Sequence, residues 1–478
     1  MTALRGFFRP PRACADMDAI SFGTDGWRAT LDTFTAPRVR TVGQAVADYL
    51  ADEGRAGETV VVGYDARPTS RGFAEELARV LCANGHDVLV PERDRPTPLV
   101  AYAIVDRGLA GGLMITASHN PPEYNGVKFI PDDGAPALPE VTDAIEANLR
   151  EPESLPESEW GEVREVDLVD PHAEHALDLV GNGVEEPLSG RTIVYDAMHG
   201  SGRDTTDALL ERAGATVQRR RCSQDDAFGG TPPEPSEENL EALVDTVRDG
   251  DADLGIANDG DADRIAVVTP DRGFLDENRF FAAIYDYLLE DDVGPAVRTV
   301  STTFLIDRVA EAHGESVVET AVGFKWVADA MGEHDALIGG EESGGFSIRG
   351  HVPEKDGVLI ALLAGVADAE ESLDDRVDRL LDEHGEIHQD KVSVDCPDAE
   401  KARVLDDLEG EIPDAVAGVD VEDVVTVDGF KLLLADGSWL LVRPSGTEPK
   451  LRVYAEAESE RRVDELLSEG RALVEVAL

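Results

Sequence analysis

One pattern occurs three times in the first two thirds of this chain. Each copy begins with an apolar run, passes through a polar turn into an amphipathic helix, and reaches a glycine before a second apolar run. The copies span residues 59–91, 191–220 and 298–321. A glycine suits the left-handed residue that ends a helix, and parallel strands need a helical crossover of this kind. The repeat predicts three similar α/β domains; one large doubly wound sheet is the alternative.

The last ninety or so residues follow another pattern. Between residues 421 and 459, short alternating strands surround Asp428-Gly429 and Asp436-Gly437, dipeptides that favour hairpin turns. Residues 461–478 have the spacing of a helix. This part predicts a smaller α+β domain.

Breaks in the pattern set the expected boundaries. Residues 1–16 contain Pro10-Pro11 and lack an apolar core, so we expect a non-native or disordered leader and a native start at Met17, and no signal peptide. The acidic, proline-containing stretch 151–160 and the stretch after Asp271 separate the repeats. The predicted domains are listed here: 17–150, 151–268, 269–386 and 387–478.

The charge balance limits the partners and the surroundings. Acidic residues number 99 and basic residues 43, giving a net charge of −56 that is spread along the chain. Self-repulsion of this size is relieved when salt shortens the Debye length to roughly 3 Å at 1 M, so we expect adaptation to a high-salt cytoplasm. An acidic chain is a poor nucleic-acid binder. The four cysteines form no C-x-x-C motif, and no apolar run is long enough to span a bilayer, so we expect a cytoplasmic protein without a membrane partner.

The loop "IANDGDADRIAVV" holds the clearest motif. Asp259, Asp261 and Asp263 alternate between two apolar strands, and three ionised carboxylates so close together need a cation. Oxygen ligands favour Mg²⁺. The motif is no EF-hand, because Arg264 stands where that loop needs glycine and Pro270 where it needs glutamate. A solvated acidic turn remains the alternative.

Two further stretches carry polar side chains between small residues. The stretch "VRPSGTEPKLRVY" groups cations and hydroxyls as in a phosphate site, in a chain that has few cations; these residues are Arg443, Ser445, Gly446, Thr447, Lys450 and Arg452. The loop 337–351 offers Glu341, Glu342 and Ser343 between glycines, as a binding site for sugar hydroxyls or as a surface turn.

The stretch "GGLMITASHNPPEYNGVKF" contains a serine in a loop rich in turn residues. Ser118 stands next to His119, and neighbouring side chains usually diverge, so we expect no Ser–His catalytic pair. The G-x-S-x-G motif of α/β-hydrolases is absent as well. A phosphorylated serine can instead donate its phosphoryl group beside Mg²⁺, and Lys128 could carry a proton.

Together these motifs resemble the α-D-phosphohexomutases, which include phosphoglucomutase and phosphomannomutase. The resemblance rests on "FGTDGWR", "TASHNPPEYNGVKF", "DGDADR", "GGEESGG" and "RPSGTEPKLR", in family order from about residue 20 almost to the end. It implies three similar α/β domains and a smaller fourth domain around a central cleft. It also implies an isomerase that binds small-molecule sugar phosphates.

The resemblance implies a role for each motif. Ser118 is the phosphoserine, and its phosphate joins Asp259, Asp261 and Asp263 in binding Mg²⁺. Lys128 and Arg28 do acid–base or supporting work, with His119 and Arg264 beside the phosphoserine. Glu341 and Ser343 contact sugar hydroxyls, and Gly323-Phe324 form a second sugar-side loop. The non-reacting phosphate is bound by Arg443, Ser445, Gly446, Thr447 and Arg452.

The implied reaction interconverts hexose 1-phosphate and hexose 6-phosphate through a hexose 1,6-bisphosphate that also serves as primer. Gly345 stands where several mannose- and glucosamine-type relatives have histidine, and the motifs favour glucose or mannose phosphates. A phosphoglucosamine mutase remains an alternative. A Mg²⁺-dependent sugar-phosphate phosphatase and a non-catalytic sugar-phosphate sensor are the other two.

Overall fold

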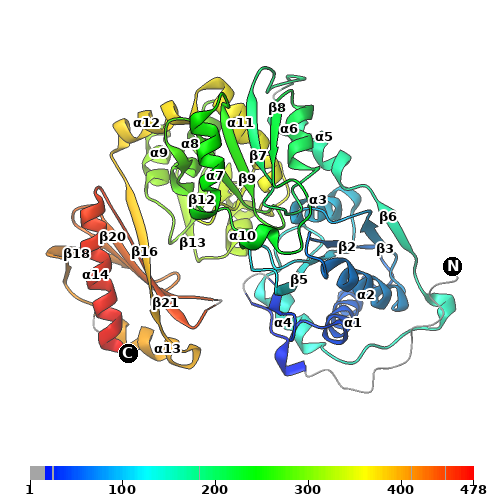
Figure 1. Ribbon diagram of the computed structural model, residues 1–478. Helices are drawn as coiled ribbons and strands as arrows, with labels where there is room; N and C mark the ends of the chain where they lie inside the picture. Colours follow the sequence, from blue (N-terminus) through cyan, green and yellow to red (C-terminus); the bar gives the residue numbers. More distant parts are fainter. Residues whose placement is uncertain (1–16, 24–25, 182, 411, 447) are drawn as a thin grey trace.

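The computed structural model describes residues 17–23, 26–181, 183–410, 412–446 and 448–478 (Figure 1). The expected leader, 1–16, and Thr447 lie outside the described residues. Four units, each with its own sheet, follow one another in an arc, with the first and the fourth at its two ends (Figure 1). The predicted three α/β domains and smaller C-terminal α+β domain are confirmed.

The first unit contains a mixed sheet with the strand order β1-β5-β4-β2-β3-β6. Its strands are β1 (Trp27–Thr30), β2 (Val60–Tyr64), β3 (Val88–Pro91), β4 (Gly112–Ile115), β5 (Tyr124–Ile130) and β6 (Val163–Val166). Its helices are α1 (Ala36–Asp52), α2 (Ser70–Ala83), α3 (Thr97–Arg107) and α4 (Pro139–Ala147). The pairs β2–β3 and β2–β4 are parallel and β4–β5 is antiparallel. The first copy of the sequence repeat is therefore β2-α2-β3, a parallel pair joined by a helical crossover.

The second unit repeats this plan with the order β11-β10-β9-β7-β8. Its strands are β7 (Thr192–Asp196), β8 (Thr216–Arg220), β9 (Leu254–Asn258), β10 (Ile265–Thr269) and β11 (Gly273–Leu275). Its helices are α5 (Val169–Val180), α6 (Thr206–Arg212) and α7 (Glu241–Asp249). Again β7 pairs in parallel with β8 and β9, while β9–β10 is antiparallel.

The third unit has the order β13-β12-β14-β15. Its strands are β12 (Ala296–Thr299), β13 (Val317–Thr320), β14 (Ile338–Gly340) and β15 (Phe346–Ile348). Its helices are α8 (Glu277–Leu288), α9 (Leu305–His313), α10 (Phe324–His334), α11 (Gly357–Glu370) and α12 (Leu373–His384). The pairs β12–β13 and β12–β14 are parallel and β14–β15 is antiparallel.

The fourth unit is an antiparallel sheet with the order β16-β21-β20-β19-β18-β17, and α14 packs across β16, β20 and β21 (Figure 1). Its strands are β16 (His388–Asp395), β17 (Ala415–Val416), β18 (Val419–Val425), β19 (Phe430–Leu434), β20 (Trp439–Pro444) and β21 (Lys450–Ala457). Its helices are α13 (Asp398–Glu409) and α14 (Glu460–Ala477). Both Asp-Gly turns join antiparallel strands, with Gly429 and Gly437 at positive φ, so the hairpin prediction is confirmed.

The first three units share part of their hydrophobic core. One apolar cluster runs through parts of the first three units, and α11 packs against α5, α6 and two strands of the second sheet. Two sheets also extend past the predicted boundaries. Strand β6 joins the first sheet beyond residue 150, and β11 joins the second sheet beyond residue 268. Strand pairing joins segments far apart in sequence, which the local pattern does not reveal.

A buried cation holds the fourth unit against the third. Lys431 Nζ of β19 lies 2.8 Å from Glu319 Oε2 of β13 and packs between the rings of Phe304 and Trp439. Burial lowers the pKa of Lys431 to about 8, with Arg298 adding to the effect. Within the part of the chain that the structure describes, no helix is both long and apolar enough to cross a membrane.

Candidate active site

Three groups of candidate site residues lie in loops at the same topological place in the first three units. Ser118 lies between β4 and β5, the three aspartates between β9 and β10, and Glu341 between β14 and β15. In each unit the loop joins the outermost strand of the parallel part of the sheet to a neighbouring antiparallel strand. The cationic loop of the fourth unit likewise joins the antiparallel strands β20 and β21. The fold thus repeats one hairpin loop and gives each copy different side chains.

Ser118 is 1% exposed and has a φ of 49°. This left-handed conformation is unusual for a residue with a Cβ, and its backbone N–H donates to Thr116 Oγ1 at 2.8 Å. The Ser118 hydroxyl donates to Asp259 Oδ2 of the second unit at 2.6 Å. The serine and the acidic loop therefore meet across the boundary between two units.

The structure corrects one expectation about this loop. The side chains of Ser118 and His119 do not diverge, because the positive φ turns them so that Ser118 Oγ lies 3.3 Å from His119 Nδ1. The Arg264 guanidinium, burial and Arg28 together lower the pKa of His119 to about 2. His119 is therefore a neutral hydrogen-bonding group in this site.

Arg67 holds the serine loop, and the sequence analysis did not find it. The guanidinium is buried and bonded to Asp65 at 3.0 Å. It donates to four backbone carbonyls of the loop, those of Ser118 (2.8 Å), Asn120 (2.6 Å), Pro121 (2.7 Å) and Tyr124 (3.2 Å). The signal that could have revealed it is the D-x-R sequence directly after the buried strand β2.

The three aspartates form a buried carboxylate cluster. Burial and the charges of Asp261 and Asp263 raise the pKa of Asp259 well above its usual value. Burial would also raise the pKa of Asp261, but the Lys128 ammonium and the Thr97 hydroxyl outweigh burial and hold that pKa below its usual range. A site of this kind gains stability from a bound cation.

Donor atoms for such a cation are present. Among the described residues, Asp261 Oδ1 and Asp263 Oδ1 are buried oxygens without a hydrogen-bond partner. Unsatisfied buried carboxylate oxygens are costly unless a cation binds them. The all-oxygen set fits Mg²⁺.

Two buried lysines contact this cluster. Lys128 Nζ lies 2.9 Å from Asp263 Oδ2 and 3.4 Å from Asp261 Oδ2. Lys355 Nζ also lies 3.4 Å from Asp263 Oδ2 and packs 5.3 Å from the centre of the Phe324 ring. Lys355 escaped the sequence analysis, although it is one of only seven lysines in the chain.

The other positive groups gather at the same place. The Nη1 atom of Arg28, on β1, lies 3.4 Å from Asn120 Oδ1 in the serine loop. The backbone N–H of Arg264 donates to Asp259 Oδ1 at 3.2 Å, and its guanidinium lies 4.0 Å from Asp263 Oδ1. Arg28 and Arg264 are also the charges that act on His119, so these residues form one cluster.

A hydrogen bond connects the residues of the third unit that are expected on the sugar side. Glu341 Oε1 accepts from the backbone N–H of Gly323, which precedes α10, at 3.0 Å. Burial raises the pKa of Glu341. Phe324 is buried at the start of α10, and Ser343 is half-buried two residues beyond Glu341. The two expected sugar-side loops therefore lie together.

The cationic loop of the fourth unit is ordered by its own polar groups. Glu448 binds both Arg452 (2.8 Å) and Lys450 (3.2 Å), and its backbone N–H donates to Ser445 Oγ at 3.3 Å. Lys401, which the sequence analysis did not identify, donates to the carbonyls of Ser445 and Glu448 at 2.6 Å each. Ser445 leads into Gly446, which is exposed.

Asp428 joins this loop to the sugar-side loop. Its Oδ2 accepts from Arg443 Nε at 2.8 Å and from the backbone N–H of Val322 at 3.2 Å. Val322 precedes Gly323 in the third unit, so one carboxylate spans both groups of candidate ligands.

The fold and these loops define the class of protein, a phosphohexomutase, which is an isomerase that moves a phosphate group. The chain belongs to the phosphoglucomutase/phosphomannomutase family. Domains I, II and III of that family, each described as alpha/beta/alpha, match residues 19–155, 171–273 and 276–384, and its C-terminal domain matches residues 392–472.

Individual proteins resemble the chain over almost its whole length. A "Phosphoglucomutase/phosphomannomutase" of Thermococcus kodakarensis is 34% identical, covering 96% of this chain and 99% of its own. A "Probable phosphoglucosamine mutase" of Methanopyrus kandleri is 36% identical, covering 94% and 96%. A crystal structure described as a phosphomannomutase of Thermus thermophilus has a TM-score of 0.84 and 32% identity, covering 96% and 99%.

Proposed function

We propose that the chain interconverts hexose 1-phosphate and hexose 6-phosphate by way of a phosphoserine at Ser118. The phosphoryl group passes from Ser118 Oγ to the free hydroxyl of a hexose monophosphate, which gives a hexose 1,6-bisphosphate. The hydroxyl proton leaves with a base, and the P–O bond to serine breaks as the new one forms. The bisphosphate then turns over, and its other phosphoryl group returns to Ser118 Oγ. No net hydrolysis occurs.

The observation that carries this proposal is the contact between Ser118 Oγ and Asp259 Oδ2 at 2.6 Å. A serine hydroxyl is a poor nucleophile alone, and a carboxylate cluster beside it suits a carrier whose phosphate shares a cation with those carboxylates. Asp259, Asp261 and Asp263 would hold Mg²⁺, supported by the unpartnered oxygens of Asp261 and Asp263. Bound Mg²⁺ supplies neutralisation of the negative charge on the phosphoryl oxygens.

Lys128 is the proposed proton carrier. Its Nζ is buried beside Asp261 and Asp263, so it can pass a proton to Asp263 and, as the neutral amine, accept the proton of a sugar hydroxyl that approaches Ser118. Arg28, Arg264 and neutral His119 supply further donors for phosphoryl oxygens. Burial of Ser118 excludes water, which would otherwise hydrolyse the phosphoserine.

The loops of the third and fourth units are the proposed sugar and phosphate contacts. Beside the Gly323-Phe324 turn, the Glu341 carboxylate accepts hydrogen bonds from sugar hydroxyls, and the Ser343 hydroxyl exchanges hydrogen bonds with them. The second phosphate binds the cationic loop, where it displaces the carboxylate of Glu448 from Arg452 and Lys450. The residues of this phosphate site are Arg443, Ser445, Gly446, Thr447 and Arg452.

Glucose and mannose phosphates are the proposed substrates, with glucosamine phosphate as the second candidate. A Cβ at Gly345 would lie 2.4 Å from Lys355 Cδ, so the Lys355 side chain occupies the space that a larger residue at position 345 would need. Lys355 thus adds a positive charge beside the sugar-side loop, where a neutral or anionic sugar face fits better than an ammonium group. The second candidate is supported by the Methanopyrus kandleri relative and its printed name.

Mass spectrometry of the Ser118 peptide tests the proposal. The purified protein is incubated with glucose 1,6-bisphosphate that carries isotopically labelled phosphate, and then with unlabelled glucose 6-phosphate or mannose 6-phosphate. We expect labelled phosphate to appear on Ser118 and to be replaced by unlabelled phosphate as the isomer forms. Release of inorganic phosphate in place of an isomer identifies a phosphatase. Binding without turnover identifies a sensor, and a Ser118 that is never phosphorylated contradicts the proposal.

A further inference from the structure

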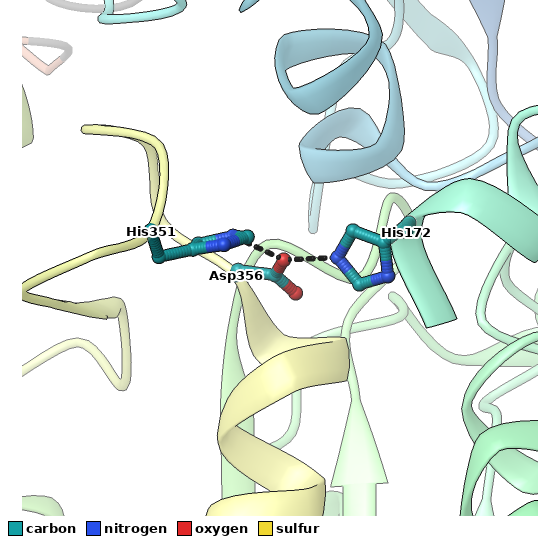
Figure 2. A group of neighbouring side chains, drawn as sticks. All are labelled: His172, His351 and Asp356. Carbon is teal, nitrogen blue, oxygen red and sulfur yellow. Dashed lines mark hydrogen bonds and ion pairs between the residues drawn. The ribbon is translucent and has the colours of Figure 1, made fainter. Parts of the chain in front are cut away.

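A second cluster of metal-ligating side chains lies outside the site described above. Figure 2 shows His172 of α5, His351 of the loop after β15, and Asp356 before α11, with both rings directed at one carboxylate oxygen. His172 Nε2 lies 2.6 Å and His351 Nε2 lies 2.8 Å from Asp356 Oδ2. All three side chains are at most 1% exposed. The second and third units thus each contribute ligand atoms to one buried point.

Two of these three groups, His351 and Asp356, are also held through their other polar atom. His351 Nδ1 lies 3.1 Å from His175 Nε2. The other carboxylate oxygen, Asp356 Oδ1, accepts from the backbone N–H groups of Val358 and Leu359 at 2.8 Å each. Metal-binding histidines usually direct their second ring nitrogen at a partner that fixes the tautomer, and ligating carboxylates are held in the same way.

The buried carboxylate requires a positive charge nearby. Asp356 is 0% exposed, and burying an ionised carboxylate is costly without a cation. Its neighbours in the cluster are the imidazoles of His172 and His351, which bind a metal in their uncharged form. A metal ion bound between these groups would supply the charge.

We propose that this cluster binds a divalent transition metal of the zinc type through His172 Nε2, His351 Nε2 and Asp356 Oδ2. Two imidazoles and one carboxylate are a common zinc ligand set, whereas Mg²⁺ prefers oxygen alone. Ligand atoms about 2.0 Å from a tetrahedral ion lie roughly 3.3 Å apart, so each contact needs to open by roughly half an ångström. Each ring coordinates through its Nε2 lone pair, so a neutral ring carries its proton on Nδ1, where that of His351 can be donated to His175 Nε2.

The position of the cluster gives the metal a structural role. Asp356 follows Lys355, whose ammonium contacts Asp263 in the active site. The metal therefore ties α5 of the second unit to the loop that positions Lys355. Its removal is expected to loosen this loop without removing any ligand of the aspartate cluster.

Metal analysis of the full-length protein tests this site. The protein is stripped with a chelator, mixed with equimolar Zn²⁺ in excess Mg²⁺, passed through a desalting column and analysed for zinc. We expect about one tightly held Zn²⁺ per chain. Co²⁺ in place of Zn²⁺ is expected to give the visible absorption bands of a tetrahedral site with nitrogen ligands. Zn²⁺ is also expected to raise the Tm of the stripped protein by several degrees.

Variants assign the ligands. We expect H172Q and H351Q to lose the tightly held Zn²⁺, the Co²⁺ bands and the Tm shift. The control H334Q changes an exposed histidine of α10 and should keep all three. D261N separates the two sites, since it changes the Mg²⁺ requirement and keeps the zinc.

Three results would overturn the proposal. They are a parent protein that retains no Zn²⁺, histidine variants that retain as much Zn²⁺ as the parent, and Co²⁺ bands that vanish in D261N. The first would identify the cluster as a hydrogen-bonded group of side chains without metal. The parent's zinc content and Co²⁺ spectrum decide the question even if the histidine variants fail to fold.

Discussion

Ser118 Oγ lies 2.6 Å from Asp259 Oδ2, and 141 residues of sequence separate the two. The serine belongs to the loop after β4 in the first unit, and the aspartate to the loop after β9 in the second. Because each loop occupies the same place in a repeated fold, packing two units edge to edge brings them together. The contact depends on both loops keeping their backbone conformation.

Replacing Ser118 with alanine removes the proposed phosphoryl carrier. We expect the mutase rate of S118A to fall at least about 1,000-fold, while the affinity for hexose phosphate changes little. A coupled isomerisation assay and titration calorimetry measure the two quantities. S468A, on an exposed position of α14, is the control and should behave as the parent. A variant S118A with parental turnover would show that another group carries the phosphoryl group.

Replacing Asp261 with asparagine removes one of the unpartnered carboxylate oxygens. We expect the Mg²⁺ concentration for half-maximal activity to rise at least about 10-fold, because the site loses one anionic ligand. Activity is measured over a Mg²⁺ titration at fixed ionic strength. D245N, which changes an exposed aspartate of α7, should leave the titration unchanged. An identical titration for D261N would place the metal elsewhere.

Asp428 connects the two groups of proposed substrate contacts, so its proposed role is to position them. In D428N, Arg443 and the backbone N–H of Val322 lose an anionic acceptor. We expect KM to rise about 10-fold with kcat changed less than about threefold, because binding is weakened more than the reacting centre. Glutamate at this position should recover part of the effect. D420N, at an exposed position of β18, is the control and should behave as the parent. A D428N variant that loses kcat while its KM stays unchanged would contradict the positioning role.

His119 makes folding sensitive to acid. Its pKa is about 2 in the native protein, mainly because of Arg264, and near 6.5 in an unfolded chain. Between these values only the unfolded state takes up the proton, so stability is lost as pH falls below about 6.5. We expect the parent to lose up to about 1.4 kcal/mol more than H119Q for each pH unit between pH 6.5 and 5. Denaturant unfolding at several pH values measures this difference; parallel curves for the two proteins would contradict the assignment.

Salt should stabilise the chain. A net charge of −56 repels itself, and raising the ionic strength from 0.1 M to 1 M shortens the Debye length from about 10 Å to about 3 Å. We expect Tm to rise steadily with KCl concentration over this range. Sucrose at equal osmolality, which carries no charge, is the control and should raise Tm less. A Tm that is flat or falling in KCl would contradict the proposed adaptation to a high-salt cytoplasm.

The sequence alone determined the parts of this protein that depend on local patterns. The three repeats, the parallel strands within them and the Asp-Gly hairpins follow from hydrophobic spacing and turn chemistry within a few tens of residues. The serine, aspartate, glutamate and arginine motifs could be identified in the same way, because each lies within one loop.

Only the tertiary structure decided which groups that are distant in sequence meet. The sequence did not reveal that Arg67 binds the Ser118 loop, that Lys355 contacts Asp263, or that His172 and His351 share the carboxylate of Asp356. The boundaries expected from the sequence, after residues 150 and 268, also separate β6 and β11 from the sheets to which they belong. These relationships come from packing and strand pairing between distant segments, whose geometry no short stretch of sequence contains.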